Sequence, residues 1–363
     1  MTGFARGPRS GATTRPAPES RLARWVARHD TAVFLAVTFG VSWPLWLVSG
    51  ALSRTPVRAP DLRWLVAQIG VFAPALAGMV VGACTSPGGA RRAVRLVAFL
   101  YVPAAALGAW IAMRGFESFA AVDAATTWAM VALGAWILVA LGTGRNRLVP
   151  WPGRPAGRAE TIAWSAGCIL GTAALLAAAW AMTAAEPASG IPVVPVRDVT
   201  VPGLVSAFAI NLAYGGSLGE EPGWRGAWLP RLLQRHPPLA ASLVISFWWA
   251  LWHAPIDLSQ GFGAAGAGAL VVRQVWTLPL TIVFTWVTLR GGGSLLPPLA
   301  LHTTLNTFPD FAAGQPGRLE NAMSSFWLLS VLIAVIVAAA DPRLRRMVPL
   351  DAAQPERTPP AGV

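Results

Sequence analysis

Apolar stretches long enough to cross a bilayer recur along almost the whole chain, and they constrain its fold more than any other feature. A hydrocarbon core of about 30 Å requires about 20 apolar residues in a helix. Such stretches lie at about 31–52, 64–84, 95–113, 124–142, 161–184, 201–219, 239–256, 271–289, 294–308 and 322–340, the ninth being short. Backbone polar groups must be satisfied inside lipid, so each stretch is expected to form a helix. The sequence therefore predicts an all-α, polytopic transmembrane helix bundle of about ten spans.

Composition excludes a soluble protein of this size. The chain is 55% hydrophobic and only 12% charged, which is far too apolar for a soluble domain. A net charge of +12 would suit a nucleic-acid-binding protein. However, all the basic residues are arginines, and they flank the apolar stretches instead of clustering in one module. We therefore expect the lipid bilayer as a partner and no nucleic acid.

The arginines predict an orientation. With the N-terminus inside, 21 arginines fall on the cytoplasmic side and seven on the other. Cytoplasmic loops carry an excess of basic residues, so this split favours cytoplasmic N- and C-termini and an even number of spans. We expect a multi-pass protein of the cell membrane.

The chain divides into six parts by composition. Proline-rich residues 185–203 separate an N-terminal half without internal acids from a half that holds the suggestive polar groups. We expect a disordered basic tail at 1–30, transmembrane helices at 31–184, an irregular loop at 185–203, a core with the suggestive polar groups at 204–310, a last transmembrane helix at 311–342 and a cytoplasmic tail at 343–363. Prolines inside the spans are tolerated where neighbouring helices satisfy the carbonyls that they free, and they occur at Pro44, Pro74, Pro103 and Pro279.

Two adjacent acids, Glu220 and Glu221, lie at the end of the apolar stretch 201–219. Ionisable groups inside a membrane are costly and usually mark function. Glu221 and Arg225 are four residues apart, so they share a helical face and can pair, whereas Glu220 points elsewhere. The pattern indicates one structural acid and one chemical acid, with Pro222 and Gly223 expected to kink the helix just past them.

Two histidine clusters follow within 90 residues. Trp249 precedes His253 by one helical turn, and His302 precedes Asn306 by the same spacing. Taken singly, a histidine in an apolar helix is more often a hydrogen-bonded core group, and an asparagine more often contributes to helix packing. The joint occurrence of these groups in one half of the chain favours a functional site.

In order and spacing, Glu220-Glu221-x-x-x-Arg225, Trp249-x-x-x-His253 and His302-x-x-x-Asn306 resemble the motifs of the CPBP or Abi family of intramembrane endopeptidases. This family includes the type II CAAX prenyl proteases. The resemblance covers about residues 200–310 and leaves the first five spans unexplained. One departure is Trp249, where the family usually has phenylalanine.

The resemblance implies that Glu220 is the base that activates water, while His253 positions that water. Glu221 and Arg225 would orient the site, and His302 with Asn306 would bind the scissile carbonyl and stabilise its oxyanion. It implies glutamate-dependent chemistry without an obligatory metal. An open site for zinc or another divalent metal, made from two histidines and one glutamate, stays an alternative, although no HExxH motif is present.

The expected substrate is a membrane-tethered peptide or protein, lipidated or not, cleaved near the cytoplasmic face. The cavity is expected to open toward Arg225, Arg231 and Arg235, with Glu220 at the cytoplasmic end of its span. A non-catalytic membrane scaffold or a bacteriocin self-immunity protein remains an alternative, and these would be favoured by a degraded site. A proton-coupled transporter is a further alternative, and polar breaks in the helices of both halves of the chain would favour it.

Overall fold

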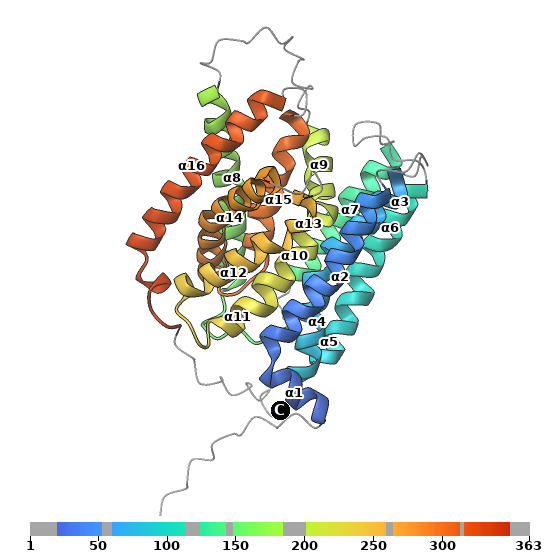
Figure 1. The fold of residues 1–363 in the computed structure, drawn as a ribbon, viewed down its shortest axis with the longest axis vertical. Coiled ribbons are helices and arrows are strands. Elements are labelled where there is room, and N and C mark those ends of the chain that lie inside the picture. The colour runs from blue at the N-terminus through green and yellow to red at the C-terminus, as the bar shows by residue number, and fades with distance from the viewer. Residues whose placement is uncertain are drawn as a thin grey trace, which may run out of the picture.

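The structure is a computed structural model that describes residues 20–52, 60–113, 124–142, 148–183, 201–258, 264–312 and 316–348. Every regular element in these ranges is helical, as the sequence predicts (Figure 1). The first half contains α1 (Arg21–Arg28), α2 (Asp30–Leu52), α3 (Pro60–Val71), α4 (Ala73–Thr85), α5 (Gly89–Leu96), η1 (Val97–Tyr101), α6 (Val102–Met113), α7 (Ala124–Gly142) and α8 (Arg158–Met182). The second half contains α9 (Val201–Tyr214), α10 (Ser217–Gly223), η3 (Trp224–Trp228), α11 (Leu229–Leu232), α12 (Pro238–Trp252), α13 (Ala254–Asp257), α14 (Ala264–Arg290), α15 (Leu296–Ala312), α16 (Pro316–Ala340) and η5 (Pro342–Leu344).

All ten predicted stretches contain helix, but they differ in length and continuity. Among the described residues, six helical segments are long and apolar enough to cross a membrane: Asp30–Leu52, Arg63–Thr85, Gly89–Trp110, Arg158–Met182, Gly266–Arg290 and Gly317–Ala340. Three further apolar helices, Thr127–Leu141, Gly203–Tyr214 and Pro238–Trp252, are shorter. The total number of crossings and their orientation stay predictions.

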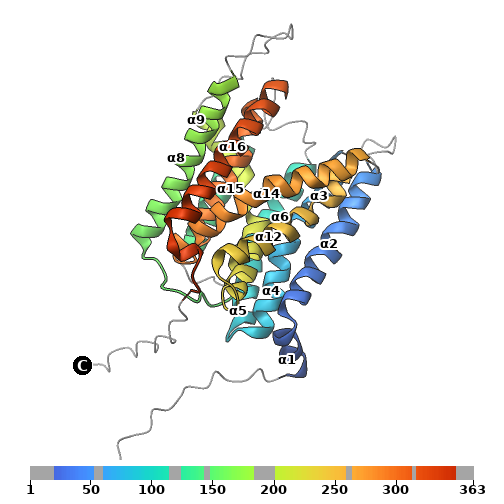
Figure 2. The same ribbon diagram turned by 60° about the vertical axis from the view of Figure 1, so that its left-hand side comes forward.

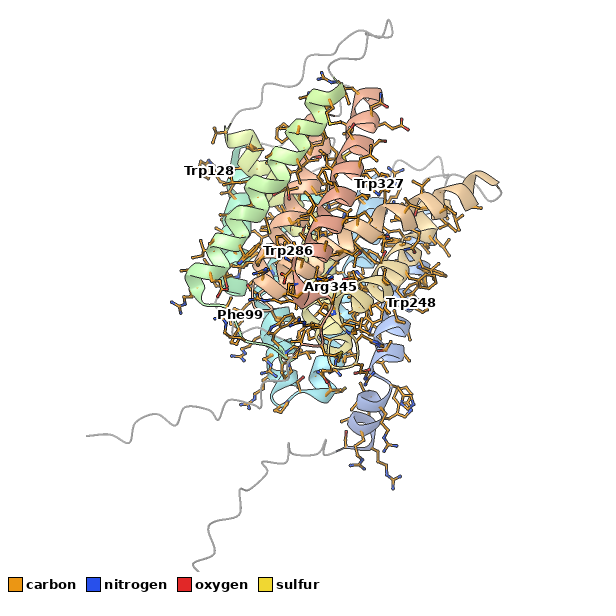
Figure 3. All side chains as sticks on the ribbon, turned by 90° about the vertical axis from the view of Figure 1, so that its left-hand side faces the viewer. Phe99, Trp128, Trp248, Trp286, Trp327 and Arg345 are labelled. Carbon is orange, nitrogen blue, oxygen red and sulfur yellow. The ribbon has the colours of Figure 1, made fainter. Side chains whose placement is uncertain are left out.

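The outer surface of the bundle is apolar, as a lipid-facing surface must be. Trp128, labelled on the outside of the bundle in Figure 3, exposes 71% of its surface, and Leu170 on α8 exposes 70%. Such side chains would be unfavourable in water, because large exposed apolar surface is rare on soluble monomers. The pattern is that of a bundle surrounded by lipid.

The prolines inside these helices follow the expected rule. A proline lacks the N–H that would bond the carbonyl four residues earlier. In four cases a side chain from another helix donates to that freed carbonyl: Ser42 to Gly70 (2.7 Å), Trp136 to Phe99, Tyr101 to Leu218 (3.2 Å) and Trp327 to Val275 (3.0 Å). The prolines concerned are Pro74, Pro103, Pro222 and Pro279. The breaks in the helical hydrogen bonding thus become contacts between helices.

Two predicted boundaries are wrong. The tail at 1–30, expected to be disordered, contains α1, because Ser20 caps its first turn by accepting from the Ala23 N–H at 3.1 Å. The loop expected at 185–203 ends earlier, since α9 begins at Val201. The remaining loop and tail predictions, at 1–19, 185–200 and 349–363, lie outside the described residues.

The helix that carries the two glutamates lies in the middle of the bundle. In Figure 1, α10 is surrounded by α2 and α4 on one side and by α12 and α15 on the other. It packs against α4, α9 and α15, while α8, α15 and α16 lie side by side (Figure 2). The first half of the chain therefore contributes directly to the surroundings of the predicted site.

Candidate active site

Glu220 lies on α10 just after a break between α9 and α10. Gly216, at φ 103°, has a backbone conformation that favours glycine, and a Cβ there would lie 2.4 Å from Glu220 Oε1. The break therefore both turns the chain and leaves room for the carboxylate. The turn at Gly216 precedes the acids, and just past them the helix changes from α10 to the π-helix η3, so the kink expected there stays a prediction.

The helix that carries Glu220 extends further past the acids than expected. Glu220 is buried, and about 11 residues of continuous helix separate it from Arg231. At 1.5 Å per residue this is roughly 16 Å, which is about half of a 30 Å hydrocarbon core. Glu220 therefore does not lie at the end of its helix, while its depth in the membrane and the side that it faces stay predictions.

Glu221, Arg225 and His302 form a buried polar cluster. The predicted pairing is confirmed, since Arg225 Nη1 lies 3.3 Å from Glu221 Oε1 and both side chains are fully buried. His302 Nδ1 lies 2.8 Å from the same carboxylate oxygen. Because Nδ1 bonds Glu221, Nε2 of His302 is the nitrogen left for the cavity, and it faces the position that a Cβ on Gly216 would occupy. Glu221 thus orients both a cation and a histidine.

Arg225 is held by aromatic rings as well as by its carboxylate. Its guanidinium carbon lies 4.4 Å from the ring centroids of both Trp249 and Phe284. Cation–π contacts of this kind gain strength where water is excluded. Within the described part of the chain, Arg225 Nε and Nη2 have no hydrogen-bond partner. Glu221 and the two rings therefore carry the stabilisation of this charge.

Trp249 contacts both Glu220 and Arg225. Its indole Nε1 donates to Glu220 Oε2 at 2.7 Å while its ring stacks on Arg225. Phenylalanine at this position would keep the stacking and lose the hydrogen bond. The difference from the usual residue of the family therefore changes the hydrogen bonding of Glu220 as well as the shape of the cavity.

His253 ends α12, one turn after Trp249. Its Nδ1 bonds the Trp249 carbonyl at 2.8 Å, and a carbonyl can only accept, so Nδ1 carries the proton. Nε2 of neutral His253 is then an acceptor. This is the state that can hold a water molecule by accepting one of its hydrogens.

Asn306 lies one turn after His302 on α15, as expected. Its Nδ2 donates to the Gly215 carbonyl, so it ties α15 to the break before α10. Asn211 holds the same region from α9, because its Nδ2 donates to Asp310 Oδ2 at 2.7 Å. An oxyanion role for Asn306 stays a proposal, while its contact with the break is a feature of the structure.

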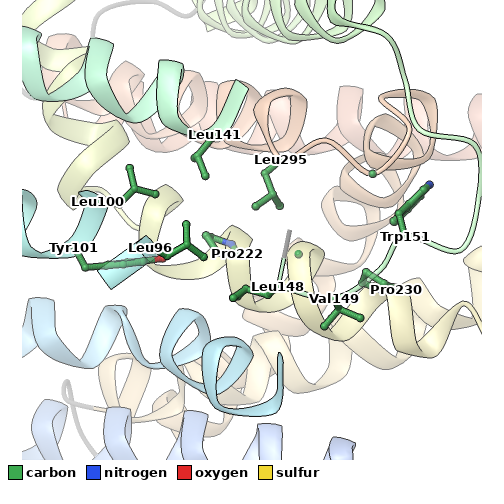
Figure 4. A pocket seen from close by; sticks show the side chains of 12 residues that line it. Leu96, Leu100, Tyr101, Leu141, Leu148, Val149, Trp151, Pro222, Pro230 and Leu295 are labelled. Atoms are coloured by element: carbon green, nitrogen blue, oxygen red, sulfur yellow. The ribbon is translucent and has the colours of Figure 1, made fainter. Parts of the chain in front are cut away.

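One cavity of about 510 Å³ brings the predicted groups together. Glu220, Trp249, His253, His302 and Asn306 all line it. Glu221 and Arg225 lie behind this wall and support it. The volume is within the range of typical ligand pockets, so an extended peptide segment fits better here than in the small apolar cavity beside Pro222 (Figure 4). That second cavity holds about 20 Å³, which is room for about one water.

The arginines predicted around the cavity mouth do not line it. Arg225 is buried, and Arg231 pairs with Asp30 at 2.7 Å, far from the cavity. Arg235 lies 3.6 Å from the same aspartate. The arginine of the cavity is Arg273 on α14. The prediction failed because the arginines were assigned by sequence position alone, whereas Arg225 is buried inside the bundle and Arg273 lies on α14 at the cavity.

Sequence reasoning missed several groups that line the cavity. Arg273 bonds Asp257 through two nitrogens, at 3.0 and 2.7 Å, and exposes 36% of its side chain. Gln68 comes from α3, and its Oε1 has no partner among the described residues. Trp46 comes from α2. The position of Arg273 inside the apolar stretch 271–289 was a usable signal, whereas no local pattern marks Gln68 or Trp46.

The independence of the site from a metal stays a prediction. In the part of the chain that the structure describes, no group of three or more histidine, cysteine, aspartate or glutamate side chains is arranged to hold a metal ion. Nδ1 of each histidine is bonded to protein, to Glu221 for His302 and to a carbonyl for His253, and these bonds leave Nε2 of each ring for the cavity.

Comparison with known proteins agrees with the three motifs. Residues 201–308 match the family described as type II CAAX prenyl endopeptidase Rce1-like. The chain is also similar to CAAX prenyl protease 2 of Methanococcus maripaludis, with 26% identity over 95 residues that cover 24% of this chain and 34% of that protein. The chain thus spans about a third of the length of this relative.

These matches and the apolar helices together indicate a multi-pass membrane protein of a protease family. The match begins where α9 begins and ends within α15, so it contains every motif residue. The resemblance expected from the motifs is confirmed: residues 201–308 match the model of the Rce1-like family of type II CAAX prenyl endopeptidases.

Proposed function

We propose that this protein is an intramembrane endopeptidase that hydrolyses a peptide bond of a membrane-tethered substrate. The observation that carries the proposal is the position of Glu220. Its carboxylate lies in a large cavity inside an apolar bundle, beside two histidines whose Nδ1 atoms are both fixed by protein groups. Peptide hydrolysis needs a base for water and donors where negative charge develops, and this arrangement supplies candidates for both.

In the proposed reaction, a water molecule lies between Glu220 and Nε2 of His253. Glu220 accepts a proton from the water as its oxygen attacks the scissile carbonyl carbon. Nε2 of His302, when it carries a proton, and Nδ2 of Asn306 donate to the carbonyl oxygen as it becomes negative. The carbon–nitrogen bond then breaks, and the leaving amine takes the proton from Glu220.

A peptide substrate suits the remaining cavity wall. Gln68 Oε1 can accept from a substrate N–H, because no described side chain or backbone group bonds it. Arg273 uses Nε and Nη2 on Asp257, which leaves Nη1 for a substrate carbonyl or carboxylate. Trp46 and Leu280 supply apolar wall on which side chains or a lipid can pack.

We further propose that the scissile bond reaches Glu220 inside the hydrocarbon core, roughly 16 Å along the helix from Arg231. The expected approach from the cytoplasmic leaflet of the cell membrane stays a prediction, because Arg273, the arginine that lines the cavity, is one of the seven assigned to the other side. A helix end or a lipidated segment can reach this depth, since the apolar part of either is stable in the hydrocarbon core. The proposal does not require a lipid on the substrate, because CAAX prenyl protease is the name of the relative and not of this protein.

The test compares membrane-anchored peptides in cells that carry wild-type protein or Glu220→Gln. Glutamine keeps the shape and can still accept from Trp249 Nε1, so folding should be retained while the base is lost. We expect cleaved termini that depend on wild-type protein and vanish with the variant. Unchanged cleavage with Glu220→Gln would refute the proposal. A phenotype that needs the chain but not Glu220 would favour the scaffold or immunity role.

A further inference from the structure

A second large cavity, distinct from the proposed active site, lies where three helices end. It measures about 530 Å³ and is bordered by the segment 148–157, the start of α8, the end of α14 and the residues that follow α16. Four arginines line it: Arg154, Arg290, Arg343 and Arg346. We propose that this cavity, called here the arginine cavity, binds the phosphate headgroup of an anionic phospholipid.

The charges in the arginine cavity are unbalanced. Arg154 pairs with Glu160 at 2.9 Å, and Arg290 pairs with Asp341 at 2.7 Å. Arg343 and Arg346 are exposed, and no ion pair to either exists within the described ranges. Two guanidinium groups are therefore left to attract an anion, and guanidinium forks match phosphate oxygens well.

Asp341 fixes one wall of the cavity. It accepts from Arg290 Nε at 2.7 Å, from Trp286 Nε1 at 3.0 Å and from the Arg343 N–H at 3.1 Å. Burial alone would raise the pKa of Asp341, but these hydrogen bonds and the charge of Arg290 lower the pKa below its ordinary value. Asp341 is thus charged at neutral pH and holds the end of α14 to η5. In the view of Figure 3, the labelled Trp286 and Arg345 both lie toward this end of α16.

The depth of the arginine cavity suits a lipid headgroup. Three of the candidate membrane spans end at it, at Arg158, Arg290 and Ala340. Trp151 and Trp164 line it, and tryptophan is enriched where a membrane meets water. Basic pockets between transmembrane helices at this level are known to hold anionic headgroups. The volume is also within the range of ligand pockets.

Membrane topology alone explains arginines near helix ends, but it does not explain why four of them border one cavity.

Free phosphate is an alternative ligand, because it shares the chemistry of the headgroup. The lipid is favoured because α8 exposes apolar Ile162 and Leu170 on the same helix that begins at the cavity, so acyl chains have a surface to lie on.

The test measures lipid binding to the full-length protein in detergent by native mass spectrometry. The probes are phosphatidylglycerol, phosphatidylcholine with the same acyl chains, and inorganic phosphate. The variant is Arg343→Gln/Arg346→Gln, which changes two exposed side chains and should fold normally. The matched control is Arg91→Gln/Arg95→Gln, which removes two exposed arginines from α5 outside the cavity.

We expect phosphatidylglycerol to bind the wild type and the control equally, and to bind the variant about 30-fold more weakly. This factor corresponds to about 1 kcal/mol for each arginine near the membrane surface. Equal binding to the variant and the wild type would overturn the proposal, and so would equal binding of phosphatidylcholine. If inorganic phosphate binds as tightly as the lipid and the variant weakens its binding by the same factor, the cavity would be assigned to free phosphate instead. None of these readouts depends on protease activity.

Discussion

Replacing Glu221 by glutamine should destabilise the protein strongly, although Glu221 is not the proposed base. Glu221 Oε1 is 3.3 Å from Arg225 Nη1, and neither side chain is exposed. Removing one member of a buried ion pair typically costs about 3–5 kcal/mol, because the other charge is left without compensation. The rings of Trp249 and Phe284 remain on Arg225, and the glutamine carbonyl can still accept one hydrogen bond. We therefore expect a loss at the lower end, about 3 kcal/mol.

The assay is unfolding in mixed micelles titrated with sodium dodecyl sulfate, followed by tryptophan fluorescence. Glu220→Gln serves as the control and should lose less than about 1 kcal/mol, because Trp249 can still donate to the amide oxygen. The double variant Glu221→Gln/Arg225→Met should regain most of the stability, since it removes the orphaned charge and places an unbranched apolar chain between the two rings. It should not regain activity, because His302 loses its carboxylate partner.

Two results would refute this reasoning. Equal stability of Glu221→Gln and the wild type would mean that the pair contributes no net stabilisation. A double variant that is no more stable than Glu221→Gln would mean that the unpaired charge was not the cause of the loss.

Four further predictions concern the same site and its orientation. Trp249→Phe should lower the unfolding free energy by about 1.5–3 kcal/mol, since it removes a hydrogen bond to a charged group; a loss no larger than that of Trp128→Phe on the outer surface would contradict this. Metal chelators should leave proteolysis unchanged, whereas inhibition that added zinc reverses would favour a two-histidine metal site. Reporter fusions after Gly190 and after Pro349 should report opposite sides of the membrane, and the same side for both would refute the ten-span arrangement. Cysteines introduced at Ile256 on the cavity wall and at Arg235 should react with a water-soluble thiol reagent from the same side; reaction from opposite sides would refute the cytoplasmic approach of the substrate while leaving the chemistry intact.

The sequence determined the class of the fold and the motif residues. Apolar stretches of spanning length must form helices, because lipid cannot satisfy backbone hydrogen bonds. The spacing of Glu221 and Arg225 determined their pairing, since residues four apart meet on any helix. For the same reason His253 and Trp249, and His302 and Asn306, could be placed one turn apart without a structure.

Only the tertiary structure decided how these pairs face one another. The carboxylate shared by Arg225 and His302 joins two helices 81 residues apart in sequence, and no local pattern encodes such a contact. From the sequence alone, a break at Gly216 could not be distinguished from a kink at Pro222. Pro222 frees the Leu218 carbonyl, and this carbonyl accepts a hydrogen bond from Tyr101 in the first half of the chain, a contact that only the tertiary structure shows. The burial of Glu220 and the place of Arg273 in the cavity also depend on which helices surround them. Spacing along one helix is fixed by its geometry, whereas the contacts between helices depend on packing of the whole bundle.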